Sequence, residues 1–334
     1  MSKRIAINGF GRIGRLAFRN LLKNEDLEVV AINDLTNPEI LAHLLKYDTA
    51  QGPFEGQVEL TEEGFLINGK TVKVSSQRNP EDLPWKELNV DIVLECTGIF
   101  RTKEAAAKHI TAGAQKVIIS APAKGDGVQT IVLGINDNEL DMANDVFSNA
   151  SCTTNCFSPV AKLVDDNWGV VTGSMTTIHS YTSDQRIQDA PHADLRRSRA
   201  AAQNIVPTST GAAVATAKVV PSVAGKISAI AFRVPVVTGS IIEFNCMVEK
   251  ETTAEEINAT FKAASEGPLK NILEYQVDPI VSSDIIRNPH SSIFDSLMTS
   301  VNGKMIKVVS WYDNEAGYSA RIADLAAIIA SKLS

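Results

Sequence analysis

A glycine-rich turn near the start of the chain constrains its fold more than any other feature. Gly9, Gly11 and Gly14 directly follow a short apolar segment at residues 5–8 and open a segment of helical spacing at residues 11–23. Glycines at this spacing let the backbone turn tightly, so that a pyrophosphate can approach the positive end of the helix. Three glycines in six residues are weak evidence alone, but the strand before them and the helix after them predict a dinucleotide-binding turn.

An acidic residue in the right place supports this interpretation. Asp34 closes a second apolar segment at residues 27–33, and lies 20 residues beyond Gly14. A carboxylate there accepts hydrogen bonds from ribose hydroxyls and would repel a 2′-phosphate, so NAD is favoured over NADP. Arg12 and Ile13, inside the turn, would flank the pyrophosphate. The alternative is a generic glycine-rich turn with an N-capping aspartate.

The first 150 residues alternate strand-like and helical segments. Residues 38–47 and 104–112 have helical character, and Asn68-Gly69 is typical of a hairpin turn. Further strands are expected at residues 90–97, 116–121, 129–135 and 146–150. Such alternation predicts a doubly wound, Rossmann-type parallel sheet.

After about residue 150 the pattern changes to longer strands of period-two character. We expect these strands at residues 170–178, 227–237, 240–249 and 305–312, and a final helix at residues 320–333. The predicted fold class is therefore α/β, with a Rossmann-type domain and an α+β catalytic domain that has a mixed, largely antiparallel sheet. The predicted boundaries are 1–150, completed by the C-terminal helix 315–334, and 151–314.

Composition narrows the class of protein. The 334 residues carry a net charge of −7, so nucleic acid is unlikely to be attracted as a primary partner by the overall field. The start lacks the apolar core of a secretion signal, and no segment approaches the roughly 18 apolar residues of a membrane helix. Four cysteines are too few for a disulfide framework, which predicts a reduced, cytoplasmic protein with no membrane partner.

One cysteine is a candidate nucleophile. Cys152 follows the expected strand 146–150 and precedes helical spacing at residues 157–164, which predicts a helix N-terminus. The helix dipole stabilises an anion there, so we expect a lowered thiol pKa. Cys156, one turn further on, is expected to point toward the packed face. A disulfide or metal site formed by this pair is disfavoured by their spacing and by the lack of further ligands, whereas two inert core cysteines remain an alternative.

Among the five histidines, His179 is the best candidate for a base. It follows the expected strand 170–178 and begins a polar loop, so it could take the proton of the Cys152 thiol. His43 and His109 lie on helical segments and are expected to be surface or packing residues. Nothing recommends His192 or His290.

Four blocks of sequence together resemble the glyceraldehyde-3-phosphate dehydrogenase family, of the phosphorylating, bacterial type. They cover the chain from residue 5 to about residue 320, and the cysteine block is the most specific. The blocks are Ile7-Asn8-Gly9-Phe10-Gly11-Arg12-Ile13-Gly14-Arg15, Ala150-Ser151-Cys152-Thr153-Thr154-Asn155-Cys156, Asn204-Ile205-Val206-Pro207-Thr208-Ser209-Thr210-Gly211-Ala212-Ala213 and Trp311-Tyr312-Asp313-Asn314-Glu315.

The resemblance implies a reaction. Cys152 would attack the aldehyde of glyceraldehyde 3-phosphate to give a hemithioacetal, with His179 as the base. Oxidation by NAD would leave a thioester, which inorganic phosphate releases as 1,3-bisphosphoglycerate. A homotetramer is also implied, with the loop at residues 181–204 at a subunit interface.

The resemblance also implies binding residues for the cofactor, the substrate and the phosphate ion. Arg78, Ser120 and Asn314 match cofactor contacts, although Asn314 could instead be the N-cap of the last helix. Thr182 and Arg233 match the pair that holds the substrate phosphate. The residues that match the surroundings of the attacking phosphate are Ser151, Thr153, Arg197, Thr210 and Gly211. Arg197 belongs to a basic run that could instead be simply solvated.

Two departures from the family pattern affect these expectations. Ala190-Pro191 stands where NAD-specific bacterial members have Leu-Pro, so some use of NADP is not excluded. Ala316 replaces a common methionine, for which we expect a packing change at the last helix. The alternative functions are an erythrose-4-phosphate dehydrogenase, which releases its thioester by hydrolysis, and a redox or nucleic-acid-binding protein that merely retains the fold.

Overall fold

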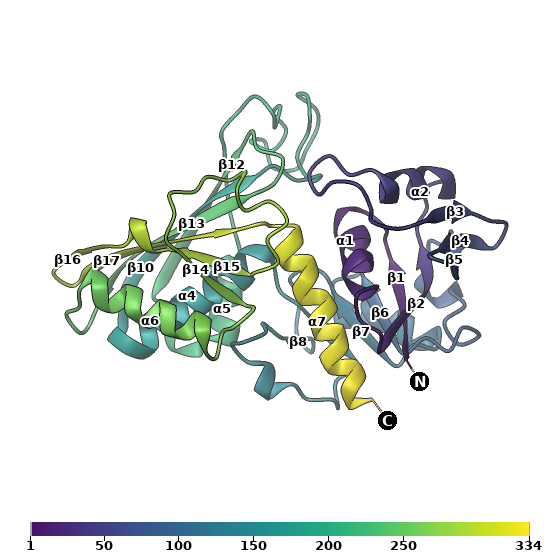
Figure 1. Ribbon diagram of the computed structural model, residues 1–334, viewed down its shortest axis with the longest axis horizontal. Coiled ribbons are helices and arrows are strands. Elements are labelled where there is room, and N and C mark those ends of the chain that lie inside the picture. The colour runs from purple at the N-terminus through teal and green to yellow at the C-terminus, as the bar shows by residue number, and fades with distance from the viewer. Residues whose placement is uncertain (1, 334) are drawn as a thin grey trace. The chain divides into compact units, whose positions relative to one another are not determined.

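The computed structural model describes residues 2–333, which form two compact units (Figure 1). Unit 1 contains the chain up to Ile131, residues Glu139–Ala150 and the segment from Ser319 onward. Unit 2 contains Val132–Asn138 and Ser151–Tyr318. The short segment 132–138 thus belongs to unit 2, although it precedes the predicted boundary at residue 150.

Unit 1 is built on one nine-stranded sheet in the order β3-β4-β5-β2-β1-β6-β7-β9-β8. Its strands are β1 (Lys3–Asn8), β2 (Leu27–Asn33), β3 (Val58–Leu60), β4 (Gly64–Ile67), β5 (Lys70–Ser75), β6 (Ile92–Glu95), β7 (Lys116–Ile119), β8 (Gln129–Thr130) and β9 (Val146–Ser148). In this order, all neighbouring strands from β5 to β8 pair in parallel. The pairs β3–β4 and β4–β5 are antiparallel. The helices before residue 150 are α1 (Arg12–Leu21), α2 (Pro38–Lys46) and α3 (Lys103–Thr111). The expected Rossmann-type parallel sheet is confirmed.

The topology of unit 1 indicates at which edge of its sheet a ligand would bind. Strand β1 pairs with β2 on one side and with β6 on the other, so the direction of winding reverses beside β1. Ligands of doubly wound sheets bind at the carboxyl ends of the strands at this reversal. The glycine turn follows the carboxyl end of β1, and it therefore lies at the reversal.

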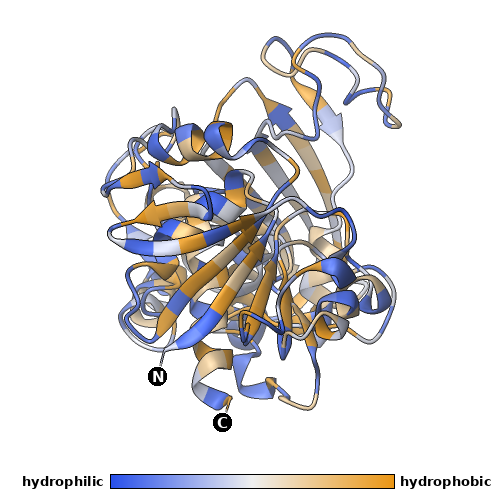
Figure 2. Cartoon of the chain, turned by 90° about the vertical axis from the view of Figure 1, so that its right-hand side faces the viewer, coloured by the Kyte–Doolittle hydropathy of each residue, from blue (hydrophilic) through white to orange (hydrophobic). Residues whose placement is uncertain are grey.

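The parallel strands are apolar because both faces of the sheet are covered. Ile5, Ile7, Val93, Ile118 and Phe147 are all fully buried. In Figure 2 the central strands facing the viewer are coloured mostly as hydrophobic. Near-continuous apolar runs are typical of parallel strands for this reason.

Unit 2 is built on a mixed sheet in the order β11-β12-β10-β13-β17-β15-β14, with β16 paired to β17. Its strands are β10 (Val170–Ser180), β11 (Val206–Thr208), β12 (Ile227–Val234), β13 (Ser240–Val248), β14 (Leu273–Gln276), β15 (Ser292–Asp295), β16 (Ser300–Asn302) and β17 (Met305–Tyr312). Its helices are α4 (Cys152–Trp168), α5 (Ala212–Val219) and α6 (Ala254–Glu266), while α7 (Ala316–Lys332) continues from unit 2 into unit 1. Most pairings are antiparallel, but β10 pairs with β12 and β14 with β15 in parallel. The expected mixed, largely antiparallel sheet is confirmed.

Aromatic contacts hold the helices of unit 2 on this sheet. Phe157 of α4 meets Phe244 of β13 edge to face, with 5.0 Å between ring centroids. Phe261 of α6 stacks on Phe294 of β15 at 3.9 Å. All four rings are fully buried. The N-terminus of α4 is therefore fixed against strands β13 and β17 by a packed core.

Several predicted bounds are shifted by one to three residues, and two predicted elements differ from the structure by four residues or more at one end. The strand expected at residues 129–135 is wrong beyond Thr130, because Ile131–Ile135 enters a turn in which Val132 O accepts from both Ile135 and Asn136. The last helix begins at Ala316, four residues before the expected start. Its first turn, Ala316-Gly317-Tyr318-Ser319, has no aliphatic side chain larger than alanine, so hydrophobic spacing alone did not indicate it.

Two features of residues 2–333 bear on possible membrane or metal partners. None of the helices there is long and apolar enough to cross a bilayer. Nor does this part of the chain gather three or more histidine, cysteine or acidic side chains into a group that could hold a metal ion.

Candidate active site

Cys152 is the first residue of helix α4, as the sequence predicted. Ser151 caps the helix, since its hydroxyl accepts from Thr154 N–H at 3.0 Å. Ala150, just before the cap, has a φ of +54°, which costs a non-glycine residue about 1 kcal/mol. The local backbone thus turns sharply between β9 and α4, and the cysteine is presented at the free N–H groups of the helix.

His179 lies opposite this cysteine. It is the second-to-last residue of β10, and it pairs with Arg233 of the neighbouring strand β12. Its Nε2 lies 3.4 Å from Cys152 Sγ, and the ring is buried. The structure therefore brings together the predicted nucleophile and the predicted base. By contrast, His109 is a buried packing residue, bonded to Trp85 and Glu95.

Arg233 contacts the other side of the His179 ring. Its Nη1 lies 2.7 Å from His179 Nδ1 and donates to Ser180 O at 3.1 Å, while Nδ1 is 2.6 Å from the same carbonyl. Each of two proton placements satisfies part of these contacts. With the proton on Nδ1, Ser180 O accepts it, Arg233 donates only to that carbonyl, and Nε2 can receive the thiol proton. With the proton on Nε2, Arg233 donates to Nδ1 and to Ser180 O, and Nε2–H donates to a thiolate. His179 is neutral in both.

Burial determines the charge state of this pair. Burial, reinforced by the charge of Arg233, lowers the pKa of His179 to about 3. Burial also raises the pKa of Cys152, against the lowering effects of Arg233, of the Thr153 N–H and hydroxyl, and of its own N–H. The expectation of a lowered thiol pKa is therefore wrong for this structure, in which desolvation outweighs the helix terminus. The cation that faces the sulfur is Arg233 rather than an imidazolium.

Cys156 is not placed to act as a nucleophile. It is fully buried, its sulfur contacts Ser292 Oγ, and burial raises its pKa to about 12. A thiol of this kind is inert at neutral pH. Of the two cysteines on α4, only Cys152 is partly exposed.

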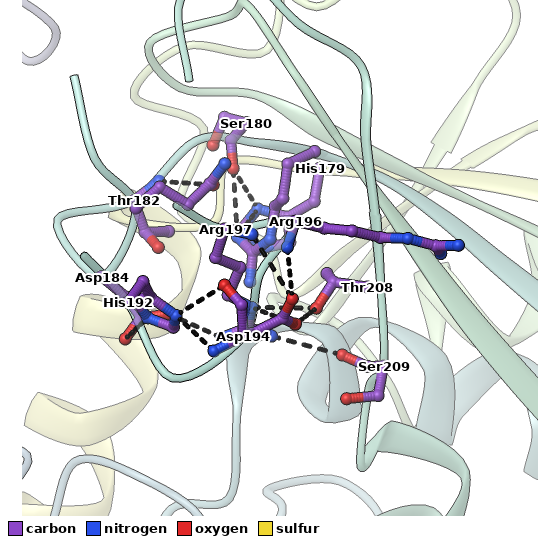
Figure 3. Close-up of polar contacts among 12 residues, drawn as sticks. His179, Ser180, Thr182, Asp184, His192, Asp194, Arg196, Arg197, Thr208 and Ser209 are labelled. Carbon is purple, nitrogen blue, oxygen red and sulfur yellow. Dashed lines mark hydrogen bonds and ion pairs between the residues drawn. The ribbon is translucent and has the colours of Figure 1, made fainter. Parts of the chain in front are cut away.

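Arg197 lies in a network of acidic and hydroxyl groups (Figure 3). Its Nη1 binds Asp184 at 2.6 Å, its Nε donates to Thr208 Oγ1 at 2.8 Å, and Asp194 lies 3.6 Å from Nε. The sequence argument did not identify either aspartate. Both lie in a polar loop, where the sequence gives no indication of which carboxylate meets which arginine.

The other predicted anion-binding groups surround the same loop. Thr182 begins a turn that Gln185 closes, with Gln185 Oε1 accepting from Thr182 N–H at 3.3 Å. Gly211 caps helix α5, and Thr210 Oγ1 accepts from Ala212 N–H at 3.2 Å. Arg233 Nε is buried and has no hydrogen-bond partner in the structure. A buried cationic donor without a partner is suited to an anionic ligand.

Asn314 is held by unit 2 through its side-chain oxygen. This oxygen accepts from Ser180 Oγ at 2.8 Å, Gly239 N–H at 3.1 Å and Ser240 Oγ at 3.0 Å. The alternative role as N-cap of the last helix is wrong, because Asp313 Oδ1 accepts from Glu315 and Ala316 N–H instead. The Nδ2 group of Asn314 remains the donor suited to a ligand amide.

The three glycines of the turn in unit 1 meet different demands. A Cβ on Gly14 would lie 2.1 Å from Gly9 O, so helix α1 can approach β1 only with glycine there. Gly9 has a φ of +91° and lies against the backbone of Thr97. A Cβ on Gly11 would meet nothing within 4 Å. The exposed Gly11 therefore opens the first turn of α1 to a pyrophosphate, which fits a dinucleotide.

Asp34 is tied to this glycine turn. Its Oδ2 accepts from Phe10 N–H at 2.7 Å and its Oδ1 from Thr36 N–H at 2.9 Å. Each oxygen keeps a further lone pair for a ribose hydroxyl. Arg12 is the first residue of α1, but its guanidinium binds Asp48, so its backbone N–H is the group suited to the pyrophosphate.

The remaining cofactor candidates of unit 1 lie at the same edge of its sheet. Ser120 follows β7 directly, and its N–H donates to Glu95 O at the end of β6. Arg78 lies in the exposed loop after β5. Ile13 is half-buried in the first turn of α1. All three therefore follow carboxyl ends of strands β1, β5 and β7, as a dinucleotide site requires.

A dinucleotide-binding α/β unit, joined to a unit with a cysteine–histidine pair at a helix N-terminus, is the arrangement of an NAD-dependent dehydrogenase. Family models identify the particular kind. Residues 3–103 match the NAD binding domain of glyceraldehyde 3-phosphate dehydrogenase, and residues 151–314 match its C-terminal domain. The chain belongs to the glyceraldehyde-3-phosphate dehydrogenase family.

Curated relatives agree over the full length. The chain is 55% identical to a glyceraldehyde-3-phosphate dehydrogenase of Geobacillus stearothermophilus, with 99% of each chain covered. It is 58% identical to that of Thermotoga maritima, with 96% of this chain and 97% of the relative covered. It is 56% identical to that of Streptomyces coelicolor, with both chains fully covered.

The glycine turn gives a paired prediction. Gly14→Ala should lower the melting temperature by several degrees and abolish NAD binding, because its Cβ collides with Gly9 O. Gly11→Ala should leave the melting temperature unchanged, because its Cβ meets no protein atom, but should weaken NAD binding where the pyrophosphate approaches. Thermal melts and NAD titration calorimetry would measure both effects. Equal melting temperatures for the two variants would contradict this account.

Arg233 should govern the reactivity of Cys152. Arg233→Gln removes the cation that lowers the thiol pKa, so the pH profile of iodoacetamide alkylation should move upward. Alkylation at pH 7 should slow roughly three- to tenfold, which corresponds to 0.5–1 pKa unit. Lys162→Gln, which removes an exposed charge from the same helix α4, is the control and should change nothing. An unchanged profile in Arg233→Gln would show that its charge does not reach the sulfur.

Proposed function

We propose that this chain catalyses the oxidation and phosphorylation of glyceraldehyde 3-phosphate to 1,3-bisphosphoglycerate with NAD, in glycolysis and in its reversal. The observation that carries the proposal is the 3.4 Å, partly buried contact between Cys152 Sγ and His179 Nε2 at a helix N-terminus. A thiol forms a thioester on oxidation of its hemithioacetal, and a thioester conserves the free energy that phosphate then captures.

The residues of unit 2 have distinct roles in this proposal. Cys152 attacks the aldehyde carbon, and His179 Nε2 takes the thiol proton as the carbon–sulfur bond forms. The protonated Nε2 then donates to the developing oxyanion, and afterwards takes the hydroxyl proton of the hemithioacetal. The positive charge of Arg233 stabilises the negative charge that develops on the sulfur as its proton leaves.

The proposal assigns the substrate phosphate and the attacking phosphate to different groups of the site. The partnerless Arg233 Nε and Thr182 are proposed to bind the substrate phosphate. Arg197, oriented by Asp184 and Thr208, is proposed to bind the attacking phosphate through Nη2, which makes only a 3.4 Å contact with Ser209 O. The other groups proposed for the attacking phosphate are Ser151, Thr153, Thr210 and Gly211.

The cofactor is assigned to residues that fit it. Residues 1–150 with the C-terminal helix 315–334 are proposed as the NAD-binding domain, and residues 151–314 as the catalytic domain. NAD, when bound, supplies the hydride acceptor of the oxidation. The proposed contacts are the glycine turn with Arg12 and Ile13 for the pyrophosphate, Asp34 and Arg78 for the adenosine, and Ser120 and Asn314 for the nicotinamide. Asp34 favours NAD, while Ala190-Pro191 leaves room for some use of NADP.

Phosphate dependence tests the reaction. NADH should form from glyceraldehyde 3-phosphate and NAD at full rate only when inorganic phosphate is present. Cys152→Ala should abolish NADH formation and leave the NAD dissociation constant unchanged, which controls for folding. Full-rate turnover without phosphate would instead indicate hydrolysis of the thioester, as in an erythrose-4-phosphate dehydrogenase. Activity in Cys152→Ala would rule out the covalent route.

We also propose a cytoplasmic homotetramer in which the loop at residues 181–204 meets a neighbouring copy. Large apolar side chains on and beside this loop are exposed in the single chain, with exposed fractions of 80% for Ile187, 82% for Leu195 and 68% for Ile205. Large apolar side chains that a single chain leaves this exposed are available for burial at a subunit interface. Light scattering should give about four times the chain mass of 36.0 kDa. Leu195→Asp should reduce that mass, and an unchanged tetramer would place the interface elsewhere.

A further inference from the structure

The last residues of three neighbouring strands in unit 1 form a row of buried polar side chains. Asn33 ends β2, Asn8 ends β1 and Glu95 ends β6, and the strand register pairs Asn8 with each of the other two. Their exposed fractions are 4%, 2% and 0%. Gly9 follows Asn8 and Asp34 follows Asn33, so this strand-end row lies where the proposed cofactor contacts begin.

Hydrogen bonds join the strand-end row in one direction. At the outer end, the main chain of Gln77 donates to Asn33 Oδ1 at 2.8 Å and accepts from Asn33 Nδ2 at 2.9 Å, which fixes the orientation of this amide. Asn33 Nδ2 also donates to Asn8 Oδ1 at 2.7 Å, and Asn8 Nδ2 donates to Glu95 Oε2 at 2.6 Å. Because Gln77 directly precedes Arg78, the series begins beside another proposed cofactor contact.

The other oxygen of Glu95 holds a backbone segment that contacts the glycine turn. Glu95 Oε1 accepts from Thr97 N–H at 2.8 Å and also from Thr97 Oγ1. A Cβ on Gly9 would lie 2.7 Å from Thr97 N, so the two backbone segments are in close contact. The carboxyl group therefore fixes the segment against which the glycine turn packs.

His109 and Trp85 determine the protonation state of this carboxyl group. Both are fully buried, and Trp85 Nε1, which can only donate, lies 3.0 Å from His109 Nδ1. Nδ1 must therefore accept, so the single ring proton is on Nε2, which donates to Glu95 Oε2 at 3.0 Å. Glu95 then accepts four hydrogen bonds, two on each oxygen, and a proton of its own would have to displace one of these donors. The group is thus a buried carboxylate held by four neutral donors.

We propose that Glu95 is a positioning residue for the NAD site, because its buried charge anchors the hydrogen bonds that fix the carboxyl ends of β1, β2 and β6. The proposal deepens the cofactor contacts given above and rests on them. Hydrogen bonds to a carboxylate are stronger than those between neutral groups, and neighbouring bonds in a series polarise one another. Burial of a charge opposes folding, so its place at this edge of the sheet is explained by the site that it orders.

The test moves the charge by one position along the strand-end row and measures NAD binding by calorimetry, with no aldehyde or phosphate present. In either orientation the new amide of Glu95→Gln sets its NH2 group against another donor, so NAD should bind roughly tenfold more weakly. Asn8→Asp alone brings two carboxylates together and should weaken binding at least as much. The double variant Asn8→Asp/Glu95→Gln should bind NAD within about threefold of the wild type.

Geometry explains why the double variant should recover. The new carboxylate at position 8 can accept from Asn33 Nδ2 on one oxygen and from the new amide at position 95 on the other. Asn8 Nδ2 lies 3.4 Å from His109 Nε2, so an oxygen in its place can also accept the imidazole proton. Every donor then meets an acceptor again, which neither substitution achieves alone.

Two further variants separate positioning from stability. Val93→Ala opens a cavity beside the same strand β6, so it should lower the melting temperature without changing the NAD dissociation constant. Glu87→Gln removes an exposed carboxylate from unit 1 and should change neither quantity. Glu95→Gln should weaken binding while retaining one NAD site per chain, which shows that the protein measured is folded.

Three results would overturn the proposal. One is an unchanged dissociation constant in Glu95→Gln. Another is an equal loss of affinity in Val93→Ala, which would indicate that any loss of stability loosens the site. The third is a double variant that binds NAD no better than Glu95→Gln, and recovery by the double variant also decides if Glu95→Gln alone fails to fold. Because the assay contains only NAD, a failure of the proposed reaction would appear in turnover and leave these results unaffected.

Discussion

The candidate active site depends on one contact: the Cys152 sulfur and the His179 Nε2 nitrogen are held 3.4 Å apart in a partly buried position. Helix α4 must be fixed against the sheet of unit 2 to a fraction of an ångström to hold that distance. The apolar packing of α4, in which Phe157 meets Phe244, supplies that rigidity. The same burial makes any charge on the pair costly. Local groups must therefore compensate, and the structure places Arg233, the helix N–H groups and the Thr153 hydroxyl around the sulfur.

Much of the fold could be predicted because its signals are local. The glycine turn, the strand before it and the acidic residue after the second strand occur within 35 residues, and each has a backbone reason for its place. Strand β17 was predicted with its observed bounds, since period-two spacing is unambiguous over eight residues. Residues 131–135 were apolar without being a strand. Their hydrophobicity serves burial in a turn, which spacing alone cannot distinguish from a short strand.

The site was less predictable because its contacts join distant residues. Thr153 and Tyr312 are 159 positions apart, and nothing in the sequence indicates that their hydroxyls meet. Asp184 and Asp194 neutralise an arginine that the sequence offered as an anion receptor. The direction of the Cys152 pKa was wrong for a quantitative reason. A helix terminus offers a modest, partly screened attraction, whereas the burial of Cys152 penalises the thiolate more strongly and raises the thiol pKa.

The bond between Asp34 and the glycine turn has a consequence for how cofactor choice can change. The carboxylate proposed to bind the ribose is also the acceptor for Phe10 N–H, inside the turn itself. Exchanging Asp34 for a small residue to admit a 2′-phosphate would leave a main-chain donor without its acceptor and loosen the pyrophosphate cradle. Evolution or engineering toward NADP must therefore proceed by coupled substitutions. A neutral side chain must accept the hydrogen bond from Phe10 N–H before the negative charge of Asp34 is removed.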